Sequence, residues 1–195
     1  MKLIGITGGI GAGKSTVAQI FSTLEIPVYD SDSKAKWLMQ HNEVLIAELK
    51  KIFGENTYTA DHQVNRTYLA KEIFNDQSKR ERMNALVHPV VKQDFKGWIQ
   101  QQVNVPYCIY ESALLIETGS YTEVDEVIVV SAPEEIRCER LLKRDSHRNE
   151  KDIRAIIKAQ LSDDERISKA SYVLLNDDQN LLLPEVIELH YKFCK

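Results

Sequence analysis

Short apolar runs alternate along the chain with longer stretches of helical periodicity. The apolar runs predict strands at residues 3–6, 26–29, 106–110, 126–130 and 172–175. Between them lie segments whose apolar residues recur three and four positions apart, as at Leu45, Leu49 and Ile52. This alternation predicts an α/β fold in which helices cover both faces of a parallel sheet.

One stretch between predicted strands, residues 33–102, is mostly helical and much longer than an ordinary connection. A turn-rich segment at residues 54–65 interrupts it, and Pro89 is expected to start a new helix, where proline is tolerated. Further along, Ser131 and Glu134 have capping-box spacing and predict a helix start. A final helix is expected from about Pro184. The long helical stretch is therefore interpreted as an insertion into the sheet domain.

Composition narrows the classes of function. The chain has 195 residues, 43% of them hydrophobic and 28% charged, which suits one globular α/β core with room for an insertion. A net charge of −4 argues against a general nucleic-acid binder. The three cysteines are far apart and lack zinc-site spacing, so reduced, inert thiols are expected. With no signal-like N-terminus and no apolar run near the ~20 residues of a membrane span, a cytoplasmic protein without membrane contact is expected, and no obligate protein partner is evident.

A glycine-rich segment directly follows the first predicted strand and reads Gly8-Gly9-Ile10-Gly11-Ala12-Gly13-Lys14-Ser15. This is the P-loop pattern, in which backbone amides and a helix N-terminus surround phosphate oxygens. Lys14 would reach the β and γ phosphates, and the Ser15 hydroxyl could ligate Mg²⁺. The bland alternative is a glycine-rich turn, but the Lys-Ser pair and the helical residues from Thr16 favour a nucleoside triphosphate site. The predicted ATP contacts in this segment are Gly8, Gly9, Gly11, Ala12, Gly13, Lys14, Ser15 and Thr16.

Three acids follow predicted strands: Asp30, Asp32 and Glu111. Ligands of open parallel sheets gather at the carboxyl ends of strands, and phosphoryl transfer needs a carboxylate to orient or deprotonate the acceptor. Capping of a helix near Ser33 is the alternative for the aspartates, and both roles can coexist. Glu111 resembles a carboxylate that acts on Mg²⁺ directly or through water; otherwise it is a surface acid at a strand end.

A basic window at residues 137–158 carries +4 while the rest of the chain carries −8. Arg137, Arg140 and Arg144 fall at i, i+3 and i+7, on one helical face. A solvated helix with local ion pairs would look the same. Because a P-loop kinase needs a basic lid that excludes water, we expect Arg140 and Arg144 to contact phosphate or adenine, and Arg148 to be a mobile lid residue.

Taken together, these motifs resemble dephospho-CoA kinase. The resemblance spans nearly the whole chain and rests on residues 5–15, Val28–Asp32, His88-Pro89, Gln160, Arg166, Ala170 and Asn176. Arg66 with Leu69 and Phe74 resembles a segment of the family's acceptor-binding domain. The implied fold is a P-loop NTPase three-layer α/β/α core with a parallel sheet, a helical CoA domain and a lid. The implied bounds are 1–32, 103–140 and 166–195 for the core, 33–102 for the acceptor domain and 141–165 for the lid.

The resemblance implies an activity and roles for individual residues. The activity is ATP-dependent phosphorylation of the ribose 3′-hydroxyl of dephospho-CoA, the last step in making coenzyme A, with Mg²⁺ as cofactor and no partners beyond the two small-molecule substrates. Asp32 is the candidate general base, with Lys14 and Arg140 as the other catalytic residues and Arg144 and Asn176 at the nucleotide. The acceptor side would include Asp32, Arg66, His88 and Leu114, and the metal side Ser15 and Glu111.

Several interpretations stay open at this level. His88 could instead cap or pack a helix. The family usually has aspartate where this chain has Glu111 and Ser171, so how directly Glu111 reaches the metal is open. Another P-loop small-molecule or nucleoside monophosphate kinase is an alternative function, although the long helical insertion favours a bulky acceptor. A nucleotide-dependent switch is the other class, but the Asn-Lys-x-Asp motif of a GTP-dependent switch does not occur.

Overall fold

The computed structural model describes residues 1–74, 76–145 and 148–195, with the side chain of Phe74 also outside the described part. It consists of two compact units. The first comprises Met1–Asp30 and Gln102–Lys195, and the second is the continuous segment Ser31–Gln101. The chain therefore leaves the first unit directly after its second strand and returns shortly before its third.

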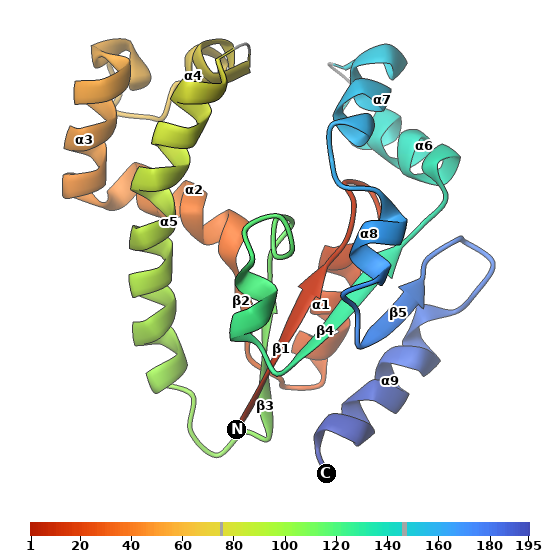
Figure 1. Ribbon diagram of the computed structural model, residues 1–195. Coiled ribbons are helices and arrows are strands. Elements are labelled where there is room, and N and C mark those ends of the chain that lie inside the picture. The colour runs from red at the N-terminus through yellow and green to blue at the C-terminus, as the bar shows by residue number, and fades with distance from the viewer. Residues whose placement is uncertain (75, 146–147) are drawn as a thin grey trace. The chain divides into compact units, whose positions relative to one another are not determined.

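The first unit is built on a parallel sheet (Figure 1). Its strands run in the order β2-β3-β1-β4-β5. Their bounds are β1 (Lys2–Thr7), β2 (Val28–Asp30), β3 (Tyr107–Glu111), β4 (Glu126–Ser131) and β5 (Tyr172–Leu175). All four pairings are parallel, which confirms the sheet predicted from the alternation of apolar runs and helices.

Two strands begin later than predicted, and in both cases a proline is the reason. Strand β2 starts after Pro27 and β3 after Pro106. Proline has no N–H to donate to a neighbouring strand, so it is excluded from the interior of a ladder. Both prolines still contribute their carbonyl groups: Pro27 accepts from the amide of Ile109, and Pro106 accepts from that of Lys2.

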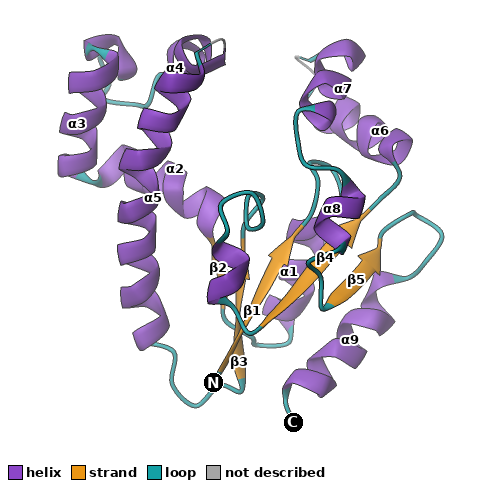
Figure 2. Cartoon of the chain, viewed as in Figure 1, coloured by secondary structure: helices purple, strands orange, loops and turns teal. Residues whose placement is uncertain are grey.

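Helices cover both faces of this sheet (Figure 2). Along β4, Ile128 and Val130 belong to one buried cluster, while Val127 and Val129 belong to another, as the period of two in a strand requires. The first cluster packs against α1 (Lys14–Thr23) and α9 (Leu182–Phe193). The second contains Leu115 from the segment after β3. The remaining helical elements of the unit are η2 (Ser120–Glu123), α6 (Glu134–Arg144), α7 (Glu150–Lys158) and α8 (Asp163–Ile167).

The predicted capping box at Ser131 and Glu134 is wrong. Strand β4 continues through Ser131, whose hydroxyl donates to Asp163 Oδ2 at 2.8 Å, and α6 begins after Pro133 without a side-chain cap. The capping box lies instead at Ser162 and Glu165, where it starts α8. Spacing alone could not distinguish the two because both have serine three residues before glutamate.

The second unit is largely helical and has its own core. Its elements are α2 (Ser31–His41), α3 (Glu43–Phe53), η1 (Glu55–Thr57), α4 (Arg66–Phe74) and α5 (Gln77–Gln100). Leu45, Leu49 and Phe53 form the buried face of α3, as their spacing predicts. The expectation that Pro89 starts a helix is wrong, because α5 runs through it. Proline removes the N–H that would bond to the carbonyl of Ala85, but packing of α5 along α2, α3 and α4 keeps the helix continuous.

Within the described ranges, no helix combines the length and apolar character needed to cross a membrane.

Candidate active site

The glycine-rich segment forms a loop between β1 and α1, as its sequence predicts. Gly13 heads α1 in the left-handed region at φ 99°, and its carbonyl accepts from the amides of Thr16 and Val17. A Cβ at Gly13 would lie 2.1 Å from Asn176 Nδ2, so both backbone conformation and a close neighbour require glycine there. The loop thus delivers the chain directly into a helix N-terminus, the arrangement that binds phosphate.

Lys14 turns back over this loop. Its Nζ donates to the carbonyls of Gly8 at 2.9 Å and Gly9 at 3.2 Å. The ammonium is therefore held beside the amides that would surround a phosphate group. A positive charge at this point can balance the charge on transferring phosphoryl oxygens.

Ser15 and Glu111 meet at the same end of the sheet. The Ser15 hydroxyl donates to Glu111 Oε1 at 3.1 Å, and Glu111, the last residue of β3, is only 6% exposed. Glu111 stands in register with Ile6 on β1 and Asp30 on β2. Paired hydroxyl and carboxylate oxygens fit Mg²⁺, which takes few protein ligands and is otherwise bound by phosphates and water. Among the described residues, no cluster of three or more His, Cys, Asp or Glu side chains that could hold a metal occurs.

Arg140 and Asn176 lie against the outside of the loop. Arg140 Nη1 donates to the Gly11 carbonyl at 3.3 Å, and its Nη2 donates to Asn176 Oδ1 at 3.1 Å and to Asp178. Asn176 Nδ2 in turn donates to the Ala12 carbonyl at 2.8 Å. Sequence reasoning selected the arginine and the asparagine but not Asp178, which belongs to no recognisable motif.

The other two arginines selected from the basic window hold Asp145. Arg144 makes a two-pronged contact through Nε at 2.8 Å and Nη2 at 3.0 Å, and Arg148 Nη1 lies 3.6 Å from the same carboxylate. The hydrogen bond to Asp145 raises the pKa of Arg144, whose guanidinium is already protonated at neutral pH. Ser146 and His147, within the expected lid, lie outside the described residues. Local ion pairs of this kind are what the alternative interpretation of the basic window, a solvated helix, predicts.

The acceptor-side candidates are distributed over both units. Asp32 lies in the first turn of α2, where a carboxylate is favoured by the helix dipole, because the helix begins at Ser31 and not near Ser33. Arg66 begins α4 and His88 lies within α5, and both are exposed. Leu114 belongs to the first unit, in the turn after β3, and is 39% exposed. Leu69 is buried, and the side chain of Phe74 lies outside the described part.

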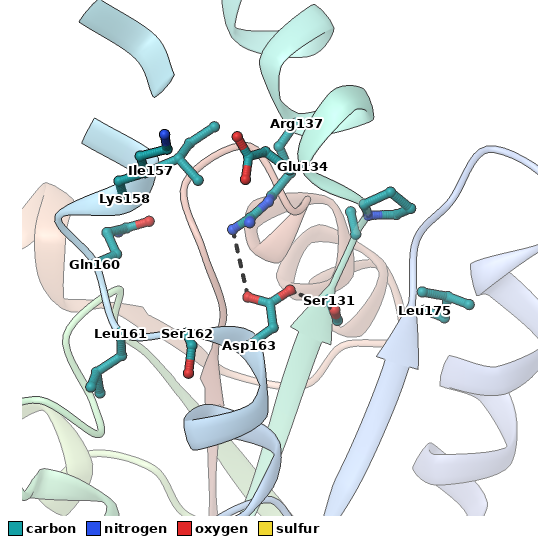
Figure 3. Close-up of a pocket in the computed structure, with 12 residues that line it drawn as sticks. Ser131, Glu134, Arg137, Ile157, Lys158, Gln160, Leu161, Ser162, Asp163 and Leu175 are labelled. Carbon is teal, nitrogen blue, oxygen red and sulfur yellow. Dashed lines mark hydrogen bonds and ion pairs between the residues drawn. The ribbon is translucent and has the colours of Figure 1, made fainter. Parts of the chain in front are cut away.

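Sequence reasoning missed the roles of Arg137, Gln160 and Asp163. Gln160 Oε1 accepts the amide of Ile10 at 2.8 Å, so the segment after α7 bonds to the loop. Arg137 and Asp163 both line a pocket of about 510 Å³, and their charged groups point toward each other, as Figure 3 shows. In the sequence, Gln160 belongs only to the family resemblance and Arg137 only to the basic helix face, and nothing in their spacing indicates contact with the loop.

Comparisons with known proteins identify the family of this chain. The family model described as dephospho-CoA kinase matches residues 2–181. A dephospho-CoA kinase from Bacteroides fragilis is 38% identical over 95% of this chain and 90% of its own. The chain belongs to the dephospho-CoA kinase family.

Solved structures show that the fold of this member of the dephospho-CoA kinase family is also similar to known ones. The crystal structure of TT1252 from Thermus thermophilus has a TM-score of 0.86 and 30% identity, covering 98% of this chain and 96% of that one. Dephospho-CoA kinase from Campylobacter jejuni has a TM-score of 0.70 at 20% identity, with the same coverage. The P-loop kinase fold expected from the sequence is confirmed.

Proposed function

We propose that this protein transfers the γ-phosphoryl group of ATP to the ribose 3′-hydroxyl of dephospho-CoA, giving coenzyme A and ADP in the final step of coenzyme A biosynthesis. The observation that carries the proposal is the phosphate loop in a member of this family. Lys14 and Arg140 donate to carbonyl groups of the loop, and Ser15 at the start of the following helix donates to Glu111. Such an arrangement suits phosphoryl transfer, which depends on positioning and on balancing charge.

The phosphate loop would hold ATP. Backbone groups of the predicted ATP contacts, which are Gly8, Gly9 and residues 11–16, would surround the phosphate oxygens, while Lys14 and Arg140 balance the charge that develops on them. Asn176 and Arg144 would contact the nucleotide. Support comes from the contacts of Arg140 and Asn176 with the carbonyls of Gly11 and Ala12.

Ser15 and Glu111 would hold Mg²⁺. When bound there together with the phosphates, the ion would supply charge neutralisation at the oxygens of the transferring group. The buried Glu111 carboxylate, already accepting from the Ser15 hydroxyl, supports this assignment.

Asp32 would act as general base on the acceptor hydroxyl. Residues 33–102, with Arg66 and His88, would form the acceptor domain, and Leu114 would contribute from the core. Residues 141–165, including Arg148, would form the lid, and 1–32, 103–140 and 166–195 the core. The free thiols at Cys108, Cys138 and Cys194 suit a reducing compartment, and we propose a cytoplasmic location with ATP and dephospho-CoA as the partners.

The test is an ADP-release assay with Mg-ATP and dephospho-CoA. We expect turnover that depends on dephospho-CoA, and Asp32→Asn should lower kcat by about 10²- to 10⁴-fold, the usual contribution of a general base, while ATP binding is kept. Asp61→Asn is the matched control, because Asp61 is an exposed aspartate of the same unit. Turnover with a nucleoside monophosphate and none with dephospho-CoA would instead identify a different P-loop kinase.

A further inference from the structure

Gly9 differs from the other glycines of the phosphate loop. Gly8, Gly11 and Gly13 have positive φ angles, but Gly9 is not among the residues that do. Its backbone would therefore accept a residue with a side chain. The space around it would not: a Cβ on Gly9 would lie 2.0 Å from Arg137 Nη1 and 3.2 Å from its Cζ. A side chain at this position would therefore displace the guanidinium that lies against the loop.

Arg137 reaches the loop from the first turn of α6 and is 7% exposed. Its Nη1 lies 3.6 Å from Asp163 Oδ1, the contact drawn in Figure 3. Asp163 is itself fixed, because its Oδ2 accepts from the Ser131 hydroxyl at 2.8 Å and its Oδ1 accepts from Arg166 Nη1 at 3.4 Å. The guanidinium is thus aimed at Gly9 by a carboxylate anchored to the end of β4 and to the fully buried Arg166.

Stability alone does not account for this arginine. Its Nε is buried without a hydrogen-bond partner among the described residues, and the contact with Asp163 is longer than a hydrogen bond. A buried charge with incomplete pairing destabilises a fold relative to a well-packed apolar side chain. The presence of such a group beside the phosphate loop points to a role in the loop.

Neighbouring loop residues are held from the same side. The amide of Ile10 donates to Gln160 Oε1 at 2.8 Å. A Cβ on Gly11 would lie 2.9 Å from the carbonyl oxygen of Arg137, so the backbone of α6 also approaches the loop closely. Residues 9–11 are therefore in contact with α6 and with the segment that follows α7.

We infer that Arg137, oriented by Asp163, is a positioning residue that holds residues 9–11 in the conformation that binds the ATP phosphates. The inference about Arg137 rests on one part of the proposed function, which is that the loop binds a nucleoside triphosphate. Gly9 is the complementary half of the contact, since its lack of a side chain makes room for the guanidinium.

Gly9→Ala, Arg137→Ala and the double variant test the inference. Alanine at Gly9 meets the far end of a flexible side chain that lines a pocket of about 510 Å³, so the variant can fold with Arg137 displaced. Gly9→Ala also keeps the charges of Arg137, Asp163 and Arg166, so the inference can still be tested if Arg137→Ala fails to fold. Gly97→Ala is the matched control, because a Cβ there meets nothing within 4 Å.

Titration calorimetry gives the ATP dissociation constant, and steady-state kinetics separate kcat from KM. We expect each single variant to weaken ATP binding by about tenfold, as for a loop correctly arranged a tenth of the time. The double variant should be no weaker than Arg137→Ala, because both changes remove the same contact. The melting temperature of Gly9→Ala should stay close to that of the unmodified protein, whereas Gly97→Ala, inside helix α5, should be equally or slightly more stable.

Two results would overturn the inference: effects of the two changes that multiply in the double variant, or single variants within about twofold of the unmodified protein. The proposed function is judged separately. If the unmodified protein binds ATP but does not phosphorylate dephospho-CoA, the acceptor assignment fails while the binding measurements still decide the role of Arg137.

Discussion

In the phosphate loop, backbone groups are contacted by side chains from α1, from α6, from the segment after α7 and from the end of β5. In the helical unit, by contrast, the acceptor candidates Arg66 and His88 are exposed residues on single helices. The first region fixes its functional groups through many partners, and the second presents them to solvent from a packed helical scaffold.

This difference teaches where substitutions should act together. Groups that share partners are coupled, whereas separated surface groups act independently. Changes around the loop should therefore affect ATP binding and turnover jointly. Changes at exposed positions of the helical unit should affect one substrate only. The predictions that follow test this division, starting with the largest expected effect.

Among the three variants considered next, the replacement of Lys14 with methionine should have the largest effect. The variant keeps the length of the side chain but removes the charge that lies beside Gly8 and Gly9, and kcat should fall by about 10²- to 10³-fold. Lys51→Met, at an exposed position of α3, is the control and should leave kcat unchanged. A normal kcat for Lys14→Met would contradict the proposed catalytic role of the loop.

Arg66→Ala should act on the acceptor alone. An exposed guanidinium that contacts a phosphate of the acceptor contributes about 1.5 kcal/mol, so KM for dephospho-CoA should rise about tenfold while KM for ATP stays constant. The matched control is Arg82→Ala, another exposed arginine of the same unit. Equal changes in both KM values would show that the two regions are not independent.

Arg154→Met should have the smallest effect, and one that depends on pH. Arg154 joins α7 to α6 through Glu135 at 2.7 Å and Glu134 at 3.2 Å, and its hydrogen bond lowers the pKa of Glu135 below the ordinary 4.5. A carboxylate with a lowered pKa stabilises the fold above its unfolded-state pKa and loses that contribution as the pH falls through the folded-state value.

Melting temperatures measured across pH check this last prediction. The difference between the unmodified protein and Arg154→Met should be present at pH 7 and should shrink below about pH 4.5. Glu135→Gln is the control, because it removes the titrating partner and should reduce the pH dependence of that difference. A difference that stays constant through the acid range would contradict the assignment.

The sequence predicted the sheet well because each strand is a local apolar run, and it failed where distant groups compete. Ser131 has the spacing of a helix cap, yet its hydroxyl bonds to Asp163 on another element. Pro89 was expected to begin a helix, yet packing against three neighbouring helices carries α5 through it. In both cases tertiary contacts outweighed a local preference.

The candidate site divides in the same way. Eight consecutive residues determine the phosphate loop, because strand, glycines, lysine and helix start are neighbours in the chain. The contact between Ile10 and Gln160 joins residues 150 positions apart, and the approach of Arg137 to Gly9 likewise spans much of the chain. No local periodicity encodes such contacts. Only the tertiary structure, in which α6 and the segment after α7 pack against the loop, brings a buried arginine and a glutamine to the site that the motif predicts.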